Sequence, residues 1–362
     1  MKIGFYAYDV GPAQALEEIA DFAKRSGHET VVLPPQIRDV SAEQAENMYG
    51  CDVALIGLSS FQTQEELILA LLLARKKIPV VIIEDTPGAA CREKAKSQEF
   101  DLPKITAAVI VAHDSSIKTA EDFGYKNVHY LGPPPHWGVS FKKLMAAKAS
   151  GIRRKLKKQH GAKLLKIAPA DKIIFVPGTK DPALDTVVLT VVTEEAKKII
   201  PPGNFVLGFK KHPGEKPESP EEKPLFTRSH ETRSNILKDE WTVDIKNYSL
   251  SELLPAADIL ISYTAATESI VAAYARLNVA YFYNEKVRYY LRRLGIKSGE
   301  WFVAELGGAY KIEDTEHIAG AIKALISPAG QKALRKEQEK HFPLPKTWNT
   351  APKYLEFLKN II

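Results

Sequence analysis

Three short segments in the second half of the chain carry side chains suited to binding two linked phosphates. Lysines and an imidazole offer positive charge, hydroxyls and small residues offer hydrogen-bond donors, and one glutamate offers a carboxylate. The residues are Gly178, Thr179, Lys180, Lys210, Lys211, His212, Ser262, Tyr263, Thr264, Thr267 and Glu268. Cations and open backbone N–H groups bind a pyrophosphate, while a carboxylate accepts hydrogen bonds from ribose hydroxyls. We therefore predict that these segments bind a nucleoside diphosphate.

A second group of candidates lies in the first half of the chain. Asp85 follows one apolar run, His113 and Asp114 follow another, and Gly11 stands in the first loop. A reaction that removes one proton from a hydroxyl needs one general base. We predict Asp85 for this role and Asp114 as the second choice, with His113 beside it. Gly11 is expected to border the same acceptor-side site.

Each candidate also has an ordinary structural explanation. An aspartate such as Asp114, which precedes two serines, commonly caps the next helix. Glu268 suits the first turn of a helix because of the helix dipole, and a histidine before a proline, such as His212, is often a packing residue. We rely on the agreement between separate segments rather than on any one residue.

The elements that must position the first-half candidates alternate between strand and helix. Apolar runs such as VALIGL lack a polar face, so both faces of these strands are expected to be buried. Gly27 suits the position after a helix, and Pro79 opens a strand directly after another helix. The predicted strands are Lys2–Tyr6, Thr30–Leu33, Val53–Leu58, Val80–Glu84, Ala107–Ala112 and Val128–Leu131, and the predicted helices are Ala13–Ser26, Ala42–Tyr49, Gln64–Lys77 and Ile117–Phe123.

The second half repeats this alternation and so predicts a second sheet. Its predicted strands are Lys172–Val176, Asn204–Phe209, Trp241–Ile245, Asp258–Ile261 and Val279–Tyr283, and its helices lie around Thr193–Ile200, Leu250–Leu254, Glu268–Leu277, Lys286–Leu294, Glu313–Ile326, Gln331–His341 and Thr350–Ile362. Repeated β-α-β units with right-handed crossovers build open, doubly wound parallel sheets. In such sheets ligands bind beyond the carboxyl ends of the strands, where both groups of candidates fall.

The domain boundaries follow from proline and charge. Three successive prolines in GPPPHW, at 132–137, are expected to form a stiff, extended connector. We therefore predict an N-terminal acceptor-side α/β domain over 1–137, a basic linker helix over 138–170, a C-terminal donor-binding α/β domain over 171–349 and a final helix over 350–362 that could cross back to the first domain. The segment 141–166 is rich in Lys and Arg and contains no acid. It is interpreted as a solvated surface helix, with peripheral contact to anionic lipid as the alternative.

Composition excludes several classes of protein. A length of 362 residues suggests two domains, and two distant cysteines favour neither a disulfide framework nor a cysteine-based zinc site. A net charge of +6 is too small to favour a nucleic-acid partner.

There is no GxGxxG, Walker A, GxSxG or HExxH motif, so no cofactor and no metal ion is predicted. No secretory leader or apolar span is visible, which predicts a cytoplasmic location, with attachment to the inner face of the membrane left open.

Several motifs resemble the GT-B superfamily of glycosyltransferases. KKHPGE at 210–215, followed by YSLSELLPAADILISYTAATES at 248–269 and LNVAYFY at 277–283, resembles the C-terminal domain of these enzymes. The similarity is to the CDP-glycerol:glycerophosphotransferase and UDP-N-acetylglucosamine 2-epimerase branches in particular. AQALEEIADFAKRSGHET at 13–30 resembles the acceptor domain, where a helix ending in GHE precedes the second strand. The resemblance implies two Rossmann-like domains that face each other across a cleft.

The resemblance also implies roles for individual residues. His212 would contact the pyrophosphate of the donor, and Glu268 would hold the ribose. Tyr263, Thr264 and Ala265 would supply donors that face the phosphates.

The chain departs from the family patterns at several positions. Ser262 stands where the family turn usually has aspartate, and Ala265 and Ala266 replace glycine or serine. Gly11-Pro12 stands in place of the Gly-Thr-Arg-Pro signature of the epimerases. Asp85-Thr86-Pro87-Gly88 occupies the strand end comparable to the one that carries the WHG histidine of the glycerophosphotransferases.

Three functions remain open at this point. The first is a transferase that moves a sugar or glycerophosphate from a nucleotide-activated donor to a glycan or lipid-linked acceptor, as in the synthesis of cell-envelope polysaccharide. The second is a nucleotide-sugar 2-epimerase, which would need carboxylates on both faces of the sugar ring and would use Glu84, Asp85 and Asp114. The third is a non-catalytic protein that binds nucleotide sugars.

Overall fold

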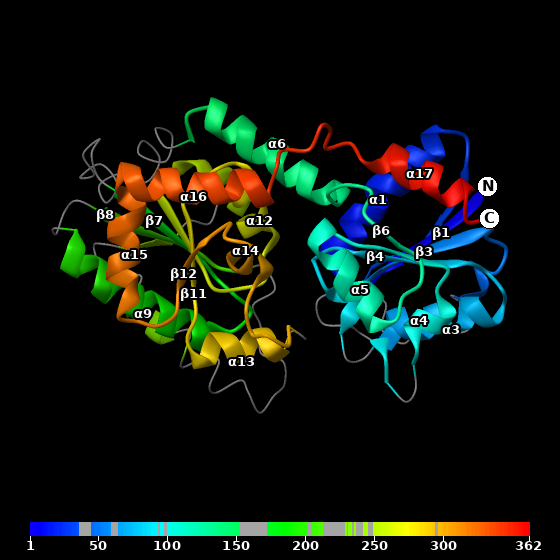
Figure 1. The fold of residues 1–362 in the computed structure, drawn as a ribbon, viewed down its shortest axis with the longest axis horizontal. Coiled ribbons are helices and arrows are strands. Elements are labelled where there is room, and N and C mark those ends of the chain that lie inside the picture. Colours follow the sequence, from blue (N-terminus) through cyan, green and yellow to red (C-terminus); the bar gives the residue numbers. More distant parts are fainter. Residues whose placement is uncertain are drawn as a thin grey trace. The chain divides into compact units, whose positions relative to one another are not determined.

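The chain forms two compact units, each with its own parallel sheet (Figure 1). The computed structural model describes residues 1–35, 45–58, 64–92, 95–97, 100–152, 172–200, 205–212, 229, 231–233, 235–236, 242–244, 249–293 and 296–362. Unit 1 comprises Met1–Val139, Arg293–Ile296 and Pro345–Ile362, and unit 2 comprises Ser140–Arg292 and Lys297–Leu344. Outside the described residues lie the start of the predicted helix 42–49, the basic residues from 153 to 166 and most of the residues from 215 to 234.

The sheet of unit 1 has the strand order β2-β1-β3-β4-β5-β6, and all its strands are parallel. Its strands are β1 (Lys2–Ala7), β2 (Glu29–Val32), β3 (Val53–Leu58), β4 (Val80–Glu84), β5 (Ala108–Ile110) and β6 (Val128–His129). The chain first winds outward from β1 to β2 and then returns to the other side of β1 for β3. The predicted continuous burial holds, because every residue of β3 and β4 is buried.

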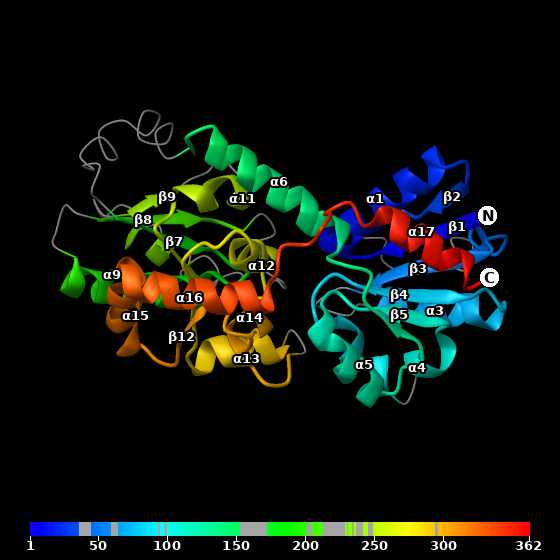
Figure 2. The same cartoon turned by 45° about the horizontal axis from the view of Figure 1, so that its top comes forward.

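Helices cover both faces of this sheet. They are α1 (Val10–Arg25), α3 (Gln64–Arg75), α4 (Leu102–Ile105), α5 (Ile117–Phe123) and α17 (Ala351–Lys359), with short 3-10 turns η1 (Ala89–Cys91) and η3 (Asp114–Ser116). One core joins α1 and α17 to the sheet through side chains such as Ile19, Tyr354 and Leu358, and α17 lies beside α1 in both views (Figures 1 and 2). The other core contains Leu69 and Leu73 of α3.

The sheet of unit 2 has the order β12-β11-β10-β7-β8-β9, again with parallel pairing. Its strands are β7 (Lys172–Pro177), β8 (Phe205–Lys210), β9 (Thr242–Asp244), β10 (Ile259–Ser262), β11 (Val279–Phe282) and β12 (Tyr310–Ile312). Its helices are α9 (Pro182–Ile199), α11 (Leu250–Leu253), the 3-10 turn η4 (Leu254–Ala256), α12 (Thr267–Tyr274), α13 (Glu285–Arg293), α14 (Phe302–Glu305), α15 (His317–Ile326) and α16 (Pro328–His341). Figure 2 shows α9 and α15 on the same side of this sheet.

Several elements differ from the sequence prediction, and the short helices α4 and α14 were not predicted at all. Pro135 does not extend a connector but begins α6 (Pro135–Ala149), because proline is accepted in the first turn of a helix, where its missing N–H is not needed. The helix α9 begins at Pro182 rather than near Thr193, and the side chain of Asp181 accepts hydrogen bonds from the N–H groups of Ala183 and Leu184. The strand β12 was not predicted, since two of its three residues are exposed.

Candidate functional site

The carboxyl end of β4 in unit 1 carries two buried acids, and the first of them serves the loop structure. Glu84 is fully buried, and its Oε1 accepts a hydrogen bond from the N–H of Ala90 at 2.9 Å. Its Oε2 accepts one from the N–H of Ala112 at 3.2 Å. Burial raises the pKa of Glu84 to about 7, although these hydrogen bonds and the charge of Arg92 oppose the shift. Glu84 therefore ties η1 and the end of β5 to the end of β4.

The second acid, Asp85, is 7% exposed and lies against the first turn of α1. Its Oδ1 accepts a hydrogen bond from the hydroxyl of Thr86 at 3.1 Å. A Cβ at position 11 would lie 3.0 Å from Oδ2, so the absence of a side chain at Gly11 leaves room for the carboxylate. The structure thus brings Asp85 and Gly11 together.

Asp85 also has an unusual proton affinity. Burial raises its pKa to about 6; the charge of Arg92 and the hydrogen bond from Thr86 oppose this shift, and the charge of Asp9 adds to it. A carboxylate with a pKa near the working pH is a stronger base than an ordinary aspartate, yet most of it is ionised at pH 7. Such a group in a strand-end loop suits proton transfer.

Arg92, which was not predicted, interacts with the charges of these acids. The side chain is 4% exposed, and neither of its terminal nitrogens has a hydrogen-bond partner in the described part of the chain. Burial lowers its pKa, and the charges of Asp85, Glu84, Glu66 and Asp9 oppose that shift. The sequence signal was weak, because Arg92 follows a loop of small residues and reaches the end of β4 only through the turn at Gly88, whose φ is +80°.

The end of β5, next to β4 in the sheet, holds the other two candidates of unit 1. His113 is 4% exposed, and its Nδ1 accepts a hydrogen bond from the N–H of Ser115 at 3.2 Å. The histidine therefore provides the cap at the start of η3 that was considered for Asp114. The side chain of Asp114 is 66% exposed and lies 3.0 Å from His113 Nδ1.

In unit 2 the three predicted segments follow neighbouring strands. The strands β10, β7 and β8 lie side by side in the sheet, and their carboxyl ends lead to Ser262, Gly178 and Lys210 respectively. The winding direction changes between β7 and β10, since β8 and β9 lie on one side of β7 and β10 lies on the other. Ligands of open parallel sheets bind at such a change of direction.

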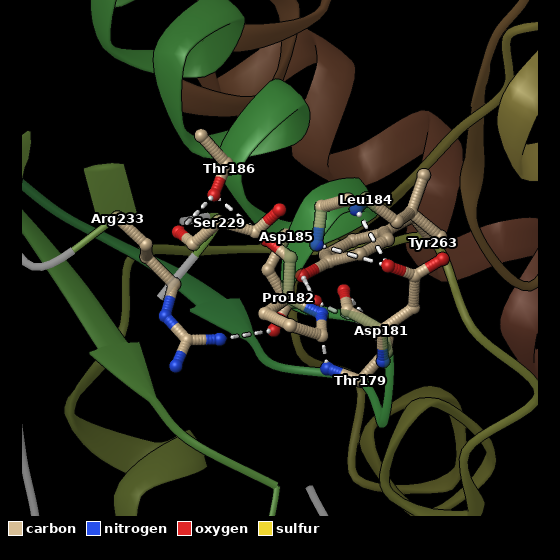
Figure 3. Close-up of polar contacts among 10 residues, drawn as sticks. Thr179, Asp181, Pro182, Leu184, Asp185, Thr186, Ser229, Arg233 and Tyr263 are labelled. Carbon is tan, nitrogen blue, oxygen red and sulfur yellow. Dashed lines mark hydrogen bonds and ion pairs between the residues drawn. The ribbon is translucent and has the colours of Figure 1, made fainter. Parts of the chain in front are cut away.

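A buried network holds two of the three loops in place (Figure 3). At its centre is Asp185 of α9, which is fully buried. Its Oδ1 accepts hydrogen bonds from the N–H and hydroxyl of Thr179 at 2.8 and 2.7 Å and from the hydroxyl of Tyr263 at 2.8 Å. Its Oδ2 pairs with Nη1 of Arg233 at 3.0 Å, and Arg233 is 2% exposed. The side chains of Thr179 and Tyr263 therefore point into the unit and position the loops.

Position 178 requires a glycine because the ends of β7 and β8 approach each other closely there. Its N–H donates to the carbonyl of Lys210 at 2.8 Å. A Cβ at this position would meet the ring of Phe209 at 2.8 Å and the same carbonyl at 2.9 Å. A side chain at position 178 would push the two loops apart.

The remaining candidates of unit 2 are more accessible. Lys211 is exposed, while Lys180, Lys210, His212, Thr264 and Thr267 are partly exposed. Glu268 lies in the first turn of α12, where burial raises its pKa and a hydrogen bond from its own N–H opposes the shift. Ala266, the residue before α12, provides no side-chain cap for the helix. Ser262 is 1% exposed, and its hydroxyl has no hydrogen-bond partner within the described residues.

Two structural features are absent from the described residues. No group of three or more His, Cys, Asp and Glu side chains among them could hold a metal ion. None of the helices there has the length and apolar character needed to span a bilayer.

Comparison with known proteins gives matches in structure but not in sequence. No family model and no curated protein sequence matches the chain. UDP-GlcNAc 2-epimerase from Neisseria meningitidis, solved with UDP-GlcNAc bound, aligns with a TM-score of 0.64 and 13% identity over 99% of this chain and 100% of the other. The epimerase from Methanocaldococcus jannaschii, in complex with UDP-GlcNAc and UDP, aligns with a TM-score of 0.63 and 12% identity over 99% and 100%. MurG from Acinetobacter baumannii aligns with a TM-score of 0.56 and 10% identity over 99% of each chain.

Because these sequence identities are low, the similarity shows only that the folds are alike. The matched structures include epimerases and glycosyltransferases, and each alignment spans both of the parallel sheets with their flanking helices. The chain has the GT-B fold.

Proposed function

We propose that this chain is a transferase that moves a sugar, or glycerophosphate, from a nucleotide-activated donor to a hydroxyl of an acceptor. In this proposal unit 2 binds the donor nucleotide, and unit 1 binds the acceptor and supplies the base. The observation that carries the proposal is the position of Asp85, a little-exposed carboxylate that directly follows β4 and lies against the first turn of α1; burial raises its pKa to about 6, which suits a base. The fold supports it, because similar structures belong to enzymes that act on nucleotide sugars.

The donor side of the mechanism uses charge that is fixed before the reaction. Lys210 ends β8, Lys211 and His212 follow it, and the loop after β10 leads to the start of α12. Cations and helix N–H groups stabilise the negative charge that develops on a departing nucleoside diphosphate. Glu268, in the first turn of α12, is proposed to accept hydrogen bonds from the ribose. In this proposal protein groups, without a bound metal ion, carry the charge.

The acceptor side needs one proton transfer. With a nucleotide sugar as the donor, Asp85 takes the proton of an acceptor hydroxyl while the oxygen attacks the anomeric carbon of the donor sugar. The bond from that carbon to the nucleotide breaks, and the nucleoside diphosphate leaves with the electron pair. The proton ends on Asp85 and is returned to water after the product leaves.

The acids around Asp85 favour a reaction with one base. Both carboxylate oxygens of Glu84 already accept hydrogen bonds from backbone N–H groups. The side chain of Asp114 is mostly exposed and lies beside His113. Of the three acids, Asp85 therefore combines burial with a carboxylate that does not join separate loops, whereas an epimerase needs one such group to remove a proton and another to return it.

Epimerisation of a nucleotide sugar is the second candidate function. The observation that favours it is the likeness to UDP-GlcNAc 2-epimerases, which have higher TM-scores than the glycosyltransferases in the comparison. Product analysis separates the two, because an epimerase changes the sugar of its nucleotide substrate without any acceptor.

Replacing His212 with alanine is expected to weaken the binding of nucleoside diphosphates by about 10- to 100-fold. A hydrogen bond to a charged phosphate contributes about 1.5–3 kcal/mol, which corresponds to this change in affinity. Calorimetric titration of the full chain with UDP, CDP and GDP measures it. His317→Ala is the matched control, because His317 belongs to the same unit and its side chain is 64% exposed. Equal affinity in the wild type and His212→Ala would remove His212 from the donor site.

Gly11→Ala is expected to lower the rate of transfer by up to about 10²-fold with little loss of stability. The new methyl group would lie 3.0 Å from Oδ2 of Asp85, so the carboxylate must move away from its position. The control is Gly320→Ala in α15, where no atom lies within 4 Å of the added carbon. If Gly11→Ala reacts as fast as the wild type, the position of Asp85 does not control the reaction.

A further inference from the structure

Arg92 in unit 1 has a side chain that suits binding of the acceptor, provided that the function proposed above holds. The guanidinium is buried and interacts with the charge of the proposed base, and its terminal nitrogens lack hydrogen-bond partners in the described part of the chain. Buried polar groups in proteins nearly always have partners, and a buried cation without any is costly. Such a group points to a ligand that supplies the missing acceptors.

An arginine restricts what this ligand offers. A guanidinium has only donors, arranged in a planar fork, and it stays charged even when buried. Its partner must therefore carry oxygen atoms that accept hydrogen bonds. Carboxylates, phosphates, carbonyls and hydroxyls all meet this requirement, so the charge of the surroundings must decide among them.

The surroundings of Arg92 are acidic. Asp85 and Glu84 come from the end of β4, Glu66 comes from α3, and Asp9 comes from the loop before α1; all four act on the charge of Arg92. Among the described residues, the charges that act most on Arg92 belong to these four carboxyl groups, so they give this part of the unit a negative balance, although the raised pKa values of Glu84 and Asp85 reduce it. A phosphate or carboxylate placed here would be repelled by these acids, whereas a hydroxyl would not.

A hydroxyl also uses both kinds of group that the site presents. Its oxygen accepts from a guanidinium, and its hydrogen is donated to a carboxylate. Arg92 and Asp85 supply this pair of opposite partners, and the side chain of Arg92 has several rotatable bonds through which it can turn toward a ligand.

We propose that Arg92 binds the hydroxyl groups of a neutral, polyhydroxylated acceptor, which makes the acceptor of this chain an uncharged sugar or polyol rather than a phosphorylated or carboxylated one. Arg92 then holds the acceptor at the carboxylate that removes its proton.

The test measures the binding of small sugars to the full chain without a nucleotide. The probes are methyl glucoside and N-acetylglucosamine, which are neutral, and glucose 6-phosphate and glucuronate, which are anionic; saturation-transfer NMR gives their affinities. We expect the anionic probes to bind at least about tenfold more weakly than the neutral ones. Tighter binding of the anionic probes would overturn the proposal, and this comparison needs no variant.

The matched variant is Arg92→Lys, which keeps the positive charge but loses the planar fork. It is expected to bind the neutral probes at least about tenfold more weakly, while its circular dichroism and melting temperature stay close to those of the wild type. Arg75→Lys, at an exposed position in α3 of the same unit, is the control and should bind like the wild type. Unchanged affinity in Arg92→Lys would show that Arg92 does not contact the sugar.

The outcome is separate from that of the proposed function. If the chain turns over nucleotide sugars but binds no neutral sugar through Arg92, the inference is wrong and the proposed function stands. If neutral sugars bind through Arg92 but no nucleoside diphosphate binds to unit 2, the inference holds and the proposed donor site is wrong.

Discussion

Replacing Asp85 with asparagine is expected to lower the rate of transfer by about 10²–10⁴-fold, which is the usual contribution of a general base. Asparagine keeps the size of the side chain but cannot accept a proton. It also removes a buried acid whose pKa burial raises to about 6, so the fold is expected to tolerate the change. Initial rates with a saturating donor, together with melting curves, separate the chemical effect from any loss of structure.

Asp114→Asn is the control for this experiment, because Asp114 was the second candidate for the base and its side chain is 66% exposed. It should react at nearly the wild-type rate. The opposite result, with a slow Asp114→Asn and a normal Asp85→Asn, would transfer the role of base to Asp114. The pH profile gives a second check: since only the ionised carboxylate accepts a proton, the wild-type rate should rise with pH through about 6 and then level off.

Asp185→Ala is expected to lower the free energy of unfolding by about 3–5 kcal/mol, the cost of breaking a buried ion pair from one side. The substitution leaves Arg233 without its carboxylate partner and the hydroxyls of Thr179 and Tyr263 without their acceptor (Figure 3). Urea denaturation followed by circular dichroism measures the change. Donor binding should fall as well, because the network holds the loops after β7 and β10.

The control is Asp181→Ala at the start of the same helix. Asp181 accepts hydrogen bonds from the N–H groups of Ala183 and Leu184, and loss of such a cap costs about 1 kcal/mol. If the two variants lose equal stability, the buried network contributes no more than an ordinary helix cap.

The pH dependence of stability reports on Asp185 alone when the variant is subtracted. Burial raises its pKa to about 7 in the folded state, above the value of about 3.9 for an unfolded aspartate. Between these two pH values the folded state binds more protons than the unfolded state. The stability that comes from protonated Asp185 is therefore fully present below about pH 4 and is lost as the pH rises to about 7. The decrease in the free energy of unfolding between pH 4 and pH 7 should be smaller in Asp185→Ala than in the wild type.

The sheets could be predicted because each of these strands is visible in the sequence as a short run of adjacent apolar residues. The apolar run VALIGL corresponds to β3 with both faces buried, and the φ of Gly27 is +79°, as the end of a helix requires. The strand ends that carry the candidate residues followed from the same runs. Errors occurred where local signals conflict, as in TVVLTVVT, whose β-branched residues disfavour the helix that the cap at Asp181 and the buried face of α9 nevertheless stabilise.

The partners of the candidate residues were not predictable, because they lie far away in the sequence. Nothing near Tyr263 indicates that its hydroxyl reaches Asp185, and nothing near Arg233 indicates its ion pair. Arg92 likewise belongs to no motif. It becomes a candidate only because the charges of four acids from three other parts of the chain act on it. The sequence could therefore place the candidate residues at strand ends but could not separate side chains that position loops from those that remain for a ligand.

One experiment tests the proposed function most directly. The chain is incubated with UDP-, CDP- and GDP-sugars, with and without neutral acceptor sugars, and the products are identified by mass spectrometry and NMR. We predict that one donor releases its nucleoside diphosphate and forms a new glycoside when an acceptor is present, with only slow hydrolysis when none is. A donor whose sugar is isomerised without any acceptor would contradict this and identify an epimerase, and binding of every donor without turnover would leave only a nucleotide-sugar-binding protein.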